Sequence, residues 1–102
     1  MGRGQPTYDL QEIQRLIGQG AISSVITTAA REGASAACMT LDELVAAVLM
    51  LEDSNFYKSM EAVERPGLWQ DVYHLVYHDT ALYIKLQLLR DGRAVVVQFK
   101  KK

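Results

Sequence analysis

Hydrophobic residues recur three or four positions apart in the first half of the chain, the spacing of helices that bury one face. Segments with this pattern are predicted to be helices: 7–20, 23–33 and 40–53. The first opens on a capping-box pair, Asp9 and Glu12, and stops near Gly18. Thr40 and Glu43 form a second such pair. We therefore expect helices to occupy the first half.

The middle helix, 23–33, has the least regular pattern of the three. Ser23 or Ser24 is its expected N-cap, because a short hydroxyl side chain can accept a hydrogen bond from the first turn. Gly33 is its expected end, since glycine adopts the left-handed conformation that often closes a helix.

After residue 54, apolar and polar positions alternate, and β-branched and aromatic residues dominate. This alternation predicts strands at 69–78, 81–89 and 94–101. Pro66-Gly67 is a turn signal before them, and Asp91-Gly92 is the signal of a tight hairpin between the last two. Helices followed by strands predict an α+β fold, with N-terminal helices packed on a C-terminal antiparallel sheet.

The Asp91-Gly92 hairpin determines which residues of the last two strands face each other. In a two-residue turn, paired residue numbers sum to about 183. Tyr83 then lies opposite Lys100, and Lys85 opposite Gln98, on the polar face of the sheet. Cross-strand neighbours have Cβ atoms about 4.5–5.5 Å apart. Such a face is either a platform for phosphate and proton transfer or a solvated surface with one cross-strand pair.

Composition fits one globular domain, 1–102, in which 1–7 is a candidate disordered segment. Of its 102 residues, 49% are hydrophobic and 23% charged, which favours a packed core over disorder. No apolar run approaches the roughly 20 residues of a membrane helix, and no signal region is evident. We therefore expect a cytoplasmic protein without a membrane partner. Cys38, the single cysteine, is expected to be a buried small hydrophobic residue.

Charge is distributed unevenly along the chain. The net charge of −1 by itself argues against binding to nucleic acid. However, residues 1–55 carry three arginines against seven acidic residues, whereas residues 56–102 carry eight basic against five acidic residues. The two halves could therefore form faces with different partners.

Four stretches carry a resemblance to a known family: NFYKSM (55–60), WQDVY (69–73), LYIKL (82–86) and VVVQFKKK (95–102). In this order and spacing they closely resemble the MqsR family, the ribonuclease toxins of bacterial type II toxin–antitoxin pairs. The resemblance covers most of the chain and is strongest from Asp53 to Lys102. It implies a RelE-like microbial ribonuclease fold and an mRNA interferase, which cuts messenger RNA at short sequences.

The resemblance also implies the site and the partners. The family's catalytic residues fall on Lys58, Gln70, Tyr83 and Lys100. RNA supplies its own nucleophile, the 2′-hydroxyl, so neither a protein nucleophile, a metal nor another cofactor is expected. The partners would be mRNA and an antitoxin with a zinc-binding N-terminal part and a helix-turn-helix part. DNA binding would occur only indirectly, through that antitoxin.

Within this site, each side chain has an expected role. Lys58 would stabilise the phosphate or act as the base, and Lys100 would be the general acid. Tyr83 would position the phosphate or share the proton transfer. Gln70 would hold the phosphate or an adjacent base. Departures from the family pattern are Asn55 in place of an acidic residue, the more basic FKKK tail, and the RPGL loop at 65–68.

Other polar and aromatic residues have two interpretations each. Candidate RNA contacts, with surface solubility or packing as the alternative, are Tyr57, Lys85, Arg93 and Lys101. Trp69 is expected to be a core anchor beneath Gln70, and His74 and His78 to be exposed or pairing residues. The competing hypothesis for the whole chain is a non-catalytic module that binds RNA or an acidic protein.

Overall fold

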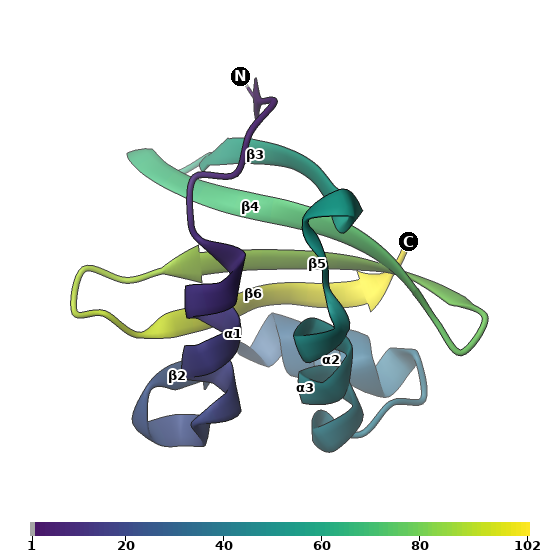
Figure 1. Cartoon of the computed structure of the whole chain (residues 1–102). Helices are drawn as coiled ribbons and strands as arrows, with labels where there is room; N and C mark the ends of the chain where they lie inside the picture. Colours follow the sequence, from purple (N-terminus) through teal and green to yellow (C-terminus); the bar gives the residue numbers. More distant parts are fainter. Residues whose placement is uncertain (1) are drawn as a thin grey trace.

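The computed structural model describes residues 2–102, which form three α-helices and one six-stranded sheet (Figure 1). The helices are α1 (Leu10–Gly18), α2 (Thr28–Ala36) and α3 (Leu41–Met50). Two 3-10 turns lie at Gly20–Ile22 and Asp53–Asn55. The strands are β1 (Gly2–Arg3), β2 (Ser24–Ile26), β3 (Phe56–Ala62), β4 (Arg65–Tyr77), β5 (Thr80–Leu88) and β6 (Ala94–Lys101).

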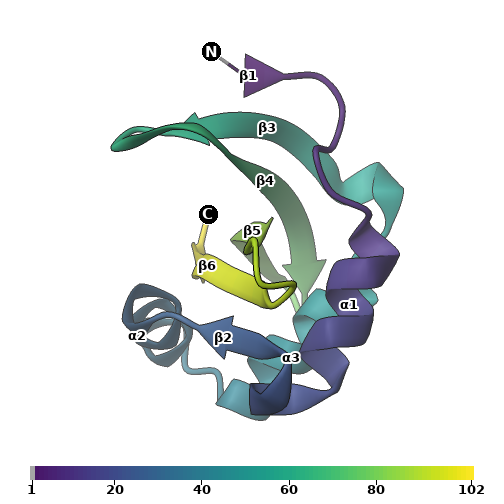
Figure 2. The ribbon, with the colours of Figure 1, turned by 90° about the vertical axis from the view of Figure 1, so that its left-hand side faces the viewer.

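The sheet has the order β1-β3-β4-β5-β6-β2 and is mixed, since β2 runs parallel to β6 and all other neighbours are antiparallel. It is strongly curved: β3 and β4 arch over β5 and β6, while α1 and α3 lie on the outer side (Figure 2). We call the side toward α1 and α3 the helix face and the concave side the open face. The predicted α+β fold is confirmed, and it is consistent with a RelE-like toxin fold.

The core lies between the helix face and the helices. Leu82, Ile84 and Leu86 alternate along β5 and are fully buried there, as the period of a strand requires. They belong to one cluster with Ile13 of α1 and Leu44 of α3. This packing fixes the side to which every second residue of β5 points, and it sends the intervening polar residues to the open face.

The first and third helices begin as predicted, with one difference. Thr40 and Glu43 form the complete capping box of α3. Asp9 caps α1 alone, because the Glu12 carboxylate pairs with the Arg15 guanidinium instead of the backbone at Asp9. The reciprocal Asp9–Glu12 box is therefore wrong.

The predicted helix 23–33 is wrong in both bounds. Residues Ser24–Ile26 form β2, which pairs with β6 in the register Val25 to Val95. Helix α2 begins only after Thr27, whose hydroxyl accepts a hydrogen bond from the amide of Ala30 at 3.0 Å. Tertiary pairing of a short apolar segment with the sheet has overridden its helical spacing.

Gly33 does not end this helix but lies within it, against β6. The residue with a left-handed backbone after α2 is Cys38, at φ 58°. The amide of Met39 bonds to the carbonyl of Ala34 at 2.9 Å, as in a Schellman ending. Cys38 is exposed, so its predicted burial is also wrong.

A strand and a turn before residue 69 differ from the predictions. Residues 56–62 form β3, which was not predicted. The chain reverses between Ala62 and Arg65, which pair with each other, and Pro66-Gly67 lies inside β4. Gly67 has φ 89° there, and its amide donates to the Glu61 carboxylate at 2.7 Å. The glycine thus accommodates an irregular strand instead of a reversal.

The N-terminal segment follows the edge of β3. Gly2 and Arg3 pair with it as β1. Further along, the amides of Thr7 and Tyr8 donate to the fully buried Asp71 carboxylate at 3.0 and 2.9 Å. Of the candidate disordered segment 1–7, Met1 lies outside the described residues.

Among residues 2–102, no single helix is long and apolar enough to span a membrane. By length and composition alone, α2 and α3 pass as a pair, bent by 96°.

Candidate functional site

The open face carries three cross-strand rows of side chains. Directly opposed residues of neighbouring strands point to the same side, so the register fixes each row. The first row is Met60, Gln70, Gln87 and Val95; the second is Lys58, Val72, Lys85 and Gln98; the third is His74, Tyr83 and Lys100. Successive rows are roughly 7 Å apart along the strands.

Tyr83 and Lys100 are paired as predicted. The Lys100 Nζ atom lies 5.1 Å from the centre of the Tyr83 ring, and the Lys85 Nζ atom lies 5.8 Å from it. The predicted pairing of Lys85 with Gln98 is also confirmed. A phenol between two ammonium groups is an arrangement that can bind an anion and donate a hydrogen bond to it.

The turn that sets this register is longer than predicted. The Leu89 amide donates to the Arg93 carbonyl at 2.8 Å, and Gly92 has φ 93°, which describes a three-residue loop. Taken alone, this loop would shift the pairing by one residue. A β-bulge in β6 restores the predicted pairing, because Val97 is an extra residue opposite the step from Lys85 to Leu86.

Lys85 occupies the centre of the open face, between Lys58 and Lys100. It is partly buried, and this burial, followed by the charges of Lys100 and Lys58, lowers the pKa of its ammonium group below the usual value. A lysine with a lowered pKa can release or accept a proton nearer neutral pH. The sequence suggested a surface phosphate contact, whereas the structure makes Lys85 the central cation.

His74 also belongs to the site, although the sequence reasoning set it aside. Its ring stacks on Tyr57 with centres 4.2 Å apart and lies 6.0 Å from the Tyr83 ring. Burial, followed by Lys102 and Lys58, lowers the pKa of His74. The signal available in the sequence was the alternation of β4, which puts His74 on the same side as Gln70.

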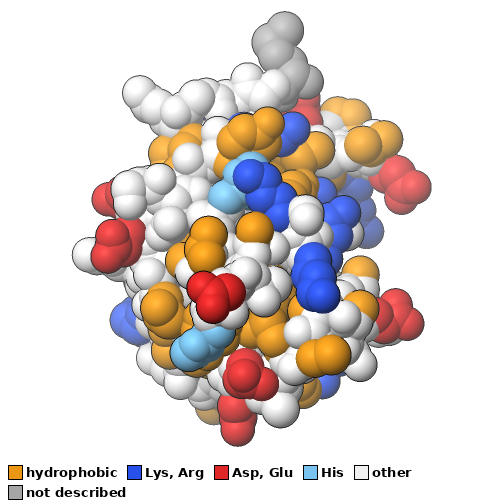
Figure 3. Space-filling view, turned by 90° about the vertical axis from the view of Figure 1, so that its right-hand side faces the viewer, with side chains coloured by type: hydrophobic (Ala, Val, Ile, Leu, Met, Phe, Trp, Pro, Cys, Tyr) orange, Lys and Arg blue, Asp and Glu red, His pale blue; other side chains and the backbone are white. Residues whose placement is uncertain are grey.

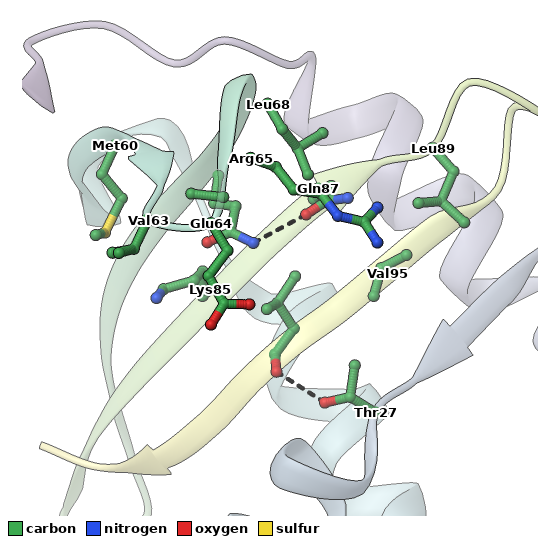
Figure 4. A pocket seen from close by; sticks show the side chains of 13 residues that line it. Thr27, Met60, Val63, Glu64, Arg65, Leu68, Lys85, Gln87, Leu89 and Val95 are labelled. Atoms are coloured by element: carbon green, nitrogen blue, oxygen red, sulfur yellow. Dashed lines mark hydrogen bonds between the residues drawn. The ribbon is translucent and has the colours of Figure 1, made fainter.

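Gln70 lies at the other end of the site, where its Nε2 donates to the Gln87 Oε1 at 3.0 Å. Gln87 has only 6% of its surface exposed, and sequence reasoning missed it. Both amides and Lys85 line a cavity of about 480 Å³ (Figure 4). The open face is thus cationic toward Lys100 and amide-lined toward Gln87.

The structure does not bring every candidate RNA contact to this site. Tyr57 is exposed and stacked on His74, so it belongs there. Arg93 lies in the β5–β6 loop, where it pairs with Asp91 at 2.9 Å. Lys101 is in register with Leu82, on the helix face.

Trp69 is not a buried core anchor. It is only partly buried, and the Arg3 guanidinium stacks 3.5 Å from its ring centre. Trp69 pairs with Glu61 and directly precedes Gln70 in β4. Because side chains alternate along a strand, Trp69 points to the side of the sheet away from Gln70.

The charge of the site is visible at the surface. Figure 3 shows Lys and Arg side chains gathered near one histidine and several hydrophobic side chains, with acidic groups elsewhere on the same face. No cluster of three or more His, Cys, Asp or Glu side chains within residues 2–102 could hold a metal ion. Lys58, Lys85 and Lys100 supply the positive charge of the second and third rows.

Comparison with known proteins shows the family of this chain. Residues 5–101 match the family described as "Motility quorum-sensing regulator, toxin of MqsA". The chain is also 28% identical, over the full length of both proteins, to the mRNA interferase toxin MqsR of Escherichia coli (strain K12). Because the family match spans nearly the whole chain, including all three rows of the open face, this protein belongs to the MqsR toxin family.

Proposed function

We propose that this toxin is an endoribonuclease that cleaves mRNA at short sequence motifs and thereby inhibits translation and growth. The observation that carries the proposal is the presence of Lys58, Lys85 and Lys100 together on the open face, the last two beside the Tyr83 ring. The name of the E. coli relative, an mRNA interferase, supports it.

The reaction would use the RNA's own nucleophile. Lys85, in its neutral form, takes the proton of a 2′-hydroxyl. The 2′-oxygen then bonds to the adjacent phosphorus, and the bond from phosphorus to the 5′-oxygen breaks. Lys100 donates a proton to that leaving oxygen. The products are a 2′,3′-cyclic phosphate and a 5′-hydroxyl, and both lysines return to their starting states by proton exchange with water.

The remaining residues of the site stabilise charge and position the phosphate. Lys58 supplies positive charge to the phosphorane, whose oxygens gain negative charge in the transition state. Burial, followed by the neighbouring Tyr57, raises the pKa of Tyr83, so its hydroxyl stays protonated and donates to a phosphate oxygen. Gln70 offers an amide to the phosphate or to an adjacent base. Since these side chains provide the charge and the proton transfers, cleavage requires no metal.

The test is cleavage of a synthetic RNA that contains the preferred site of the wild-type protein. Lys58→Ala, Tyr83→Phe and Lys100→Ala should each slow cleavage by about 10²–10⁴-fold. Wild-type cleavage should persist in EDTA and yield cyclic phosphate ends. Full activity of all three variants would refute the site, and loss of activity in EDTA would refute the metal-independent mechanism.

A non-catalytic binding module is the second candidate, because the same lysines would also bind RNA without cutting it. Wild-type protein that binds the RNA and leaves it intact would show that the toxin is a binding module.

We further propose that the cognate antitoxin has a zinc-binding N-terminal part and a helix-turn-helix part. The toxin contacts DNA only through this antitoxin, in the cytoplasm. DNA binding by the purified toxin alone would contradict this.

A further inference from the structure

The cavity of about 480 Å³ lies at the Gln70 end of the open face, between the β3–β4 hairpin and the strands β5 and β6. Its walls are apolar on both sides: Met60 and Leu68 come from the hairpin side, Val95 and Val97 from β6 (Figure 4). The volume is within the range of small-molecule sites. Two opposed apolar walls suit a flat ring.

The polar part of the cavity is a pair of amides. Gln87 is nine-tenths buried, and its Oε1 is occupied by the Gln70 Nε2. An amide side chain has one oxygen acceptor and two N–H donors. This bond therefore leaves the Gln87 Nε2 as donor and the Gln70 Oε1 as acceptor. Adjacent donor and acceptor groups are what a nucleobase edge requires for recognition.

The cavity is continuous with the proposed catalytic residues. Lys85 lines it and also stands in the same row as Lys58, with Val72 between them. Gln70 and Gln87 are one row away from Lys85, roughly 7 Å along the strands. A phosphate held at Lys85 would thus place the base of an adjoining nucleotide at the amide pair.

We propose that this cavity is a nucleobase pocket, and that Gln87 is a specificity-determining residue for the nucleotide next to the scissile phosphate. The inference deepens the proposed function and rests on it. The base lies between the apolar walls, and the Gln87 Nε2 donates to an acceptor on its edge. Arg65, which also lines the cavity, is placed to donate to the same nucleotide.

The test replaces the Gln87 Nε2 donor by an acceptor oxygen. Gln87→Glu keeps the size of the side chain but removes the Nε2 donor. Sequencing of the 5′ ends of cleaved transcripts should show a roughly tenfold change of base preference at one position beside the cut, as loss of one base-edge contact implies. The matched control is Gln11→Glu, the same change at an exposed position of α1 outside the cavity, which should leave base preference unaltered.

A second variant fills the cavity without altering a polar group. Val97→Phe should weaken the same base preference, whereas Val76→Phe, on an exposed strand position outside the cavity, should not. Unchanged preference in Gln87→Glu would overturn the pocket while wild-type cleavage still supported the ribonuclease. If Gln87→Glu fails to fold, Val97→Phe decides by the same criterion. A wild-type protein that cleaves no RNA would overturn both proposals.

Discussion

Gly33 of α2 lies directly against the carbonyl group of Phe99 on β6. A methyl group added at Gly33 would overlap the Phe99 carbonyl oxygen and approach the Cβ of Lys100 to 3.3 Å. Helix α2 is therefore packed on β6 through its backbone, next to a proposed catalytic lysine. This contact explains why a residue with poor helix propensity occurs inside the helix.

Gly33→Ala should destabilise the protein by about 1–3 kcal/mol, because the helix must shift away from β6 to make room. Urea unfolding followed by circular dichroism measures this change. Gly18→Ala is the control, since a methyl group at the end of α1 meets nothing within 4 Å. Gly33→Ala with wild-type stability would show that α2 moves freely on the sheet.

Cys38→Gly should stabilise the protein by about 1 kcal/mol. Cys38 has φ 58° after α2, and a residue with a Cβ is strained there, whereas glycine is not. The same unfolding measurement applies. Cys38→Ser keeps the Cβ and should leave stability unchanged, so an equal gain in both variants would point to the thiol instead of the backbone.

The pairing of Tyr83 with Lys100 was predictable, but two local features that set it were not. The loop at Gly92 is one residue longer than assumed, and the bulge at Val97 compensates for it. Thr27 bonds to this region, with its amide on the Val96 carbonyl at 3.2 Å and its hydroxyl on the Val97 carbonyl at 2.7 Å. A contact 70 residues away in the sequence leaves no trace in the local pattern of β6.

Alternation along β5 and β6 predicted the polar side of the sheet, and the family resemblance supplied Lys58 and Gln70. The burial of Gln87 and the cavity that it lines were not predictable, because both depend on how far β3 and β4 arch over β5 (Figure 2). Curvature arises from irregular pairing, such as the breaks in register along β3. The alternation of polar and apolar residues along one strand does not indicate where the sheet will curve.

His74 should make stability depend on pH below neutrality. Burial and the charges of Lys102 and Lys58 lower its pKa below 6.5, so the folded protein resists its protonation. The unfolded chain then binds more protons. The contribution of His74 to the free energy of unfolding is fully present above pH 6.5. It is lost as the pH falls through this value toward the lower pKa of His74 in the folded state.

Equilibrium unfolding between pH 7.5 and pH 5, in steps of about half a unit around the ordinary histidine value, tests this dependence. His74→Asn should lose less stability over this range than the wild type. His78→Asn makes the same change in the exposed β4–β5 turn and is the control for the substitution itself. Parallel curves for the wild type and His74→Asn would contradict the assignment.

Lys85→Arg separates proton transfer from charge. Arginine preserves the positive charge at the centre of the open face but is not deprotonated in proteins. If Lys85 is the base, the variant should cleave about 10²–10⁴-fold more slowly than the wild type. If Lys85 only attracts phosphate, the variant should cleave at nearly the wild-type rate.

The pH dependence of the rate gives the second readout. The pKa of Lys85 is lowered below 10.5 by burial and by Lys100 and Lys58. The neutral amine is the active form. The wild-type cleavage rate, after subtraction of uncatalysed hydrolysis, should therefore rise with pH, and the midpoint of this rise should lie below pH 10.5. Lys85→Arg should lack this rise, whereas Lys58→Arg, which keeps a purely electrostatic role, should retain it. A rise of equal size in Lys85→Arg would assign the base to another group.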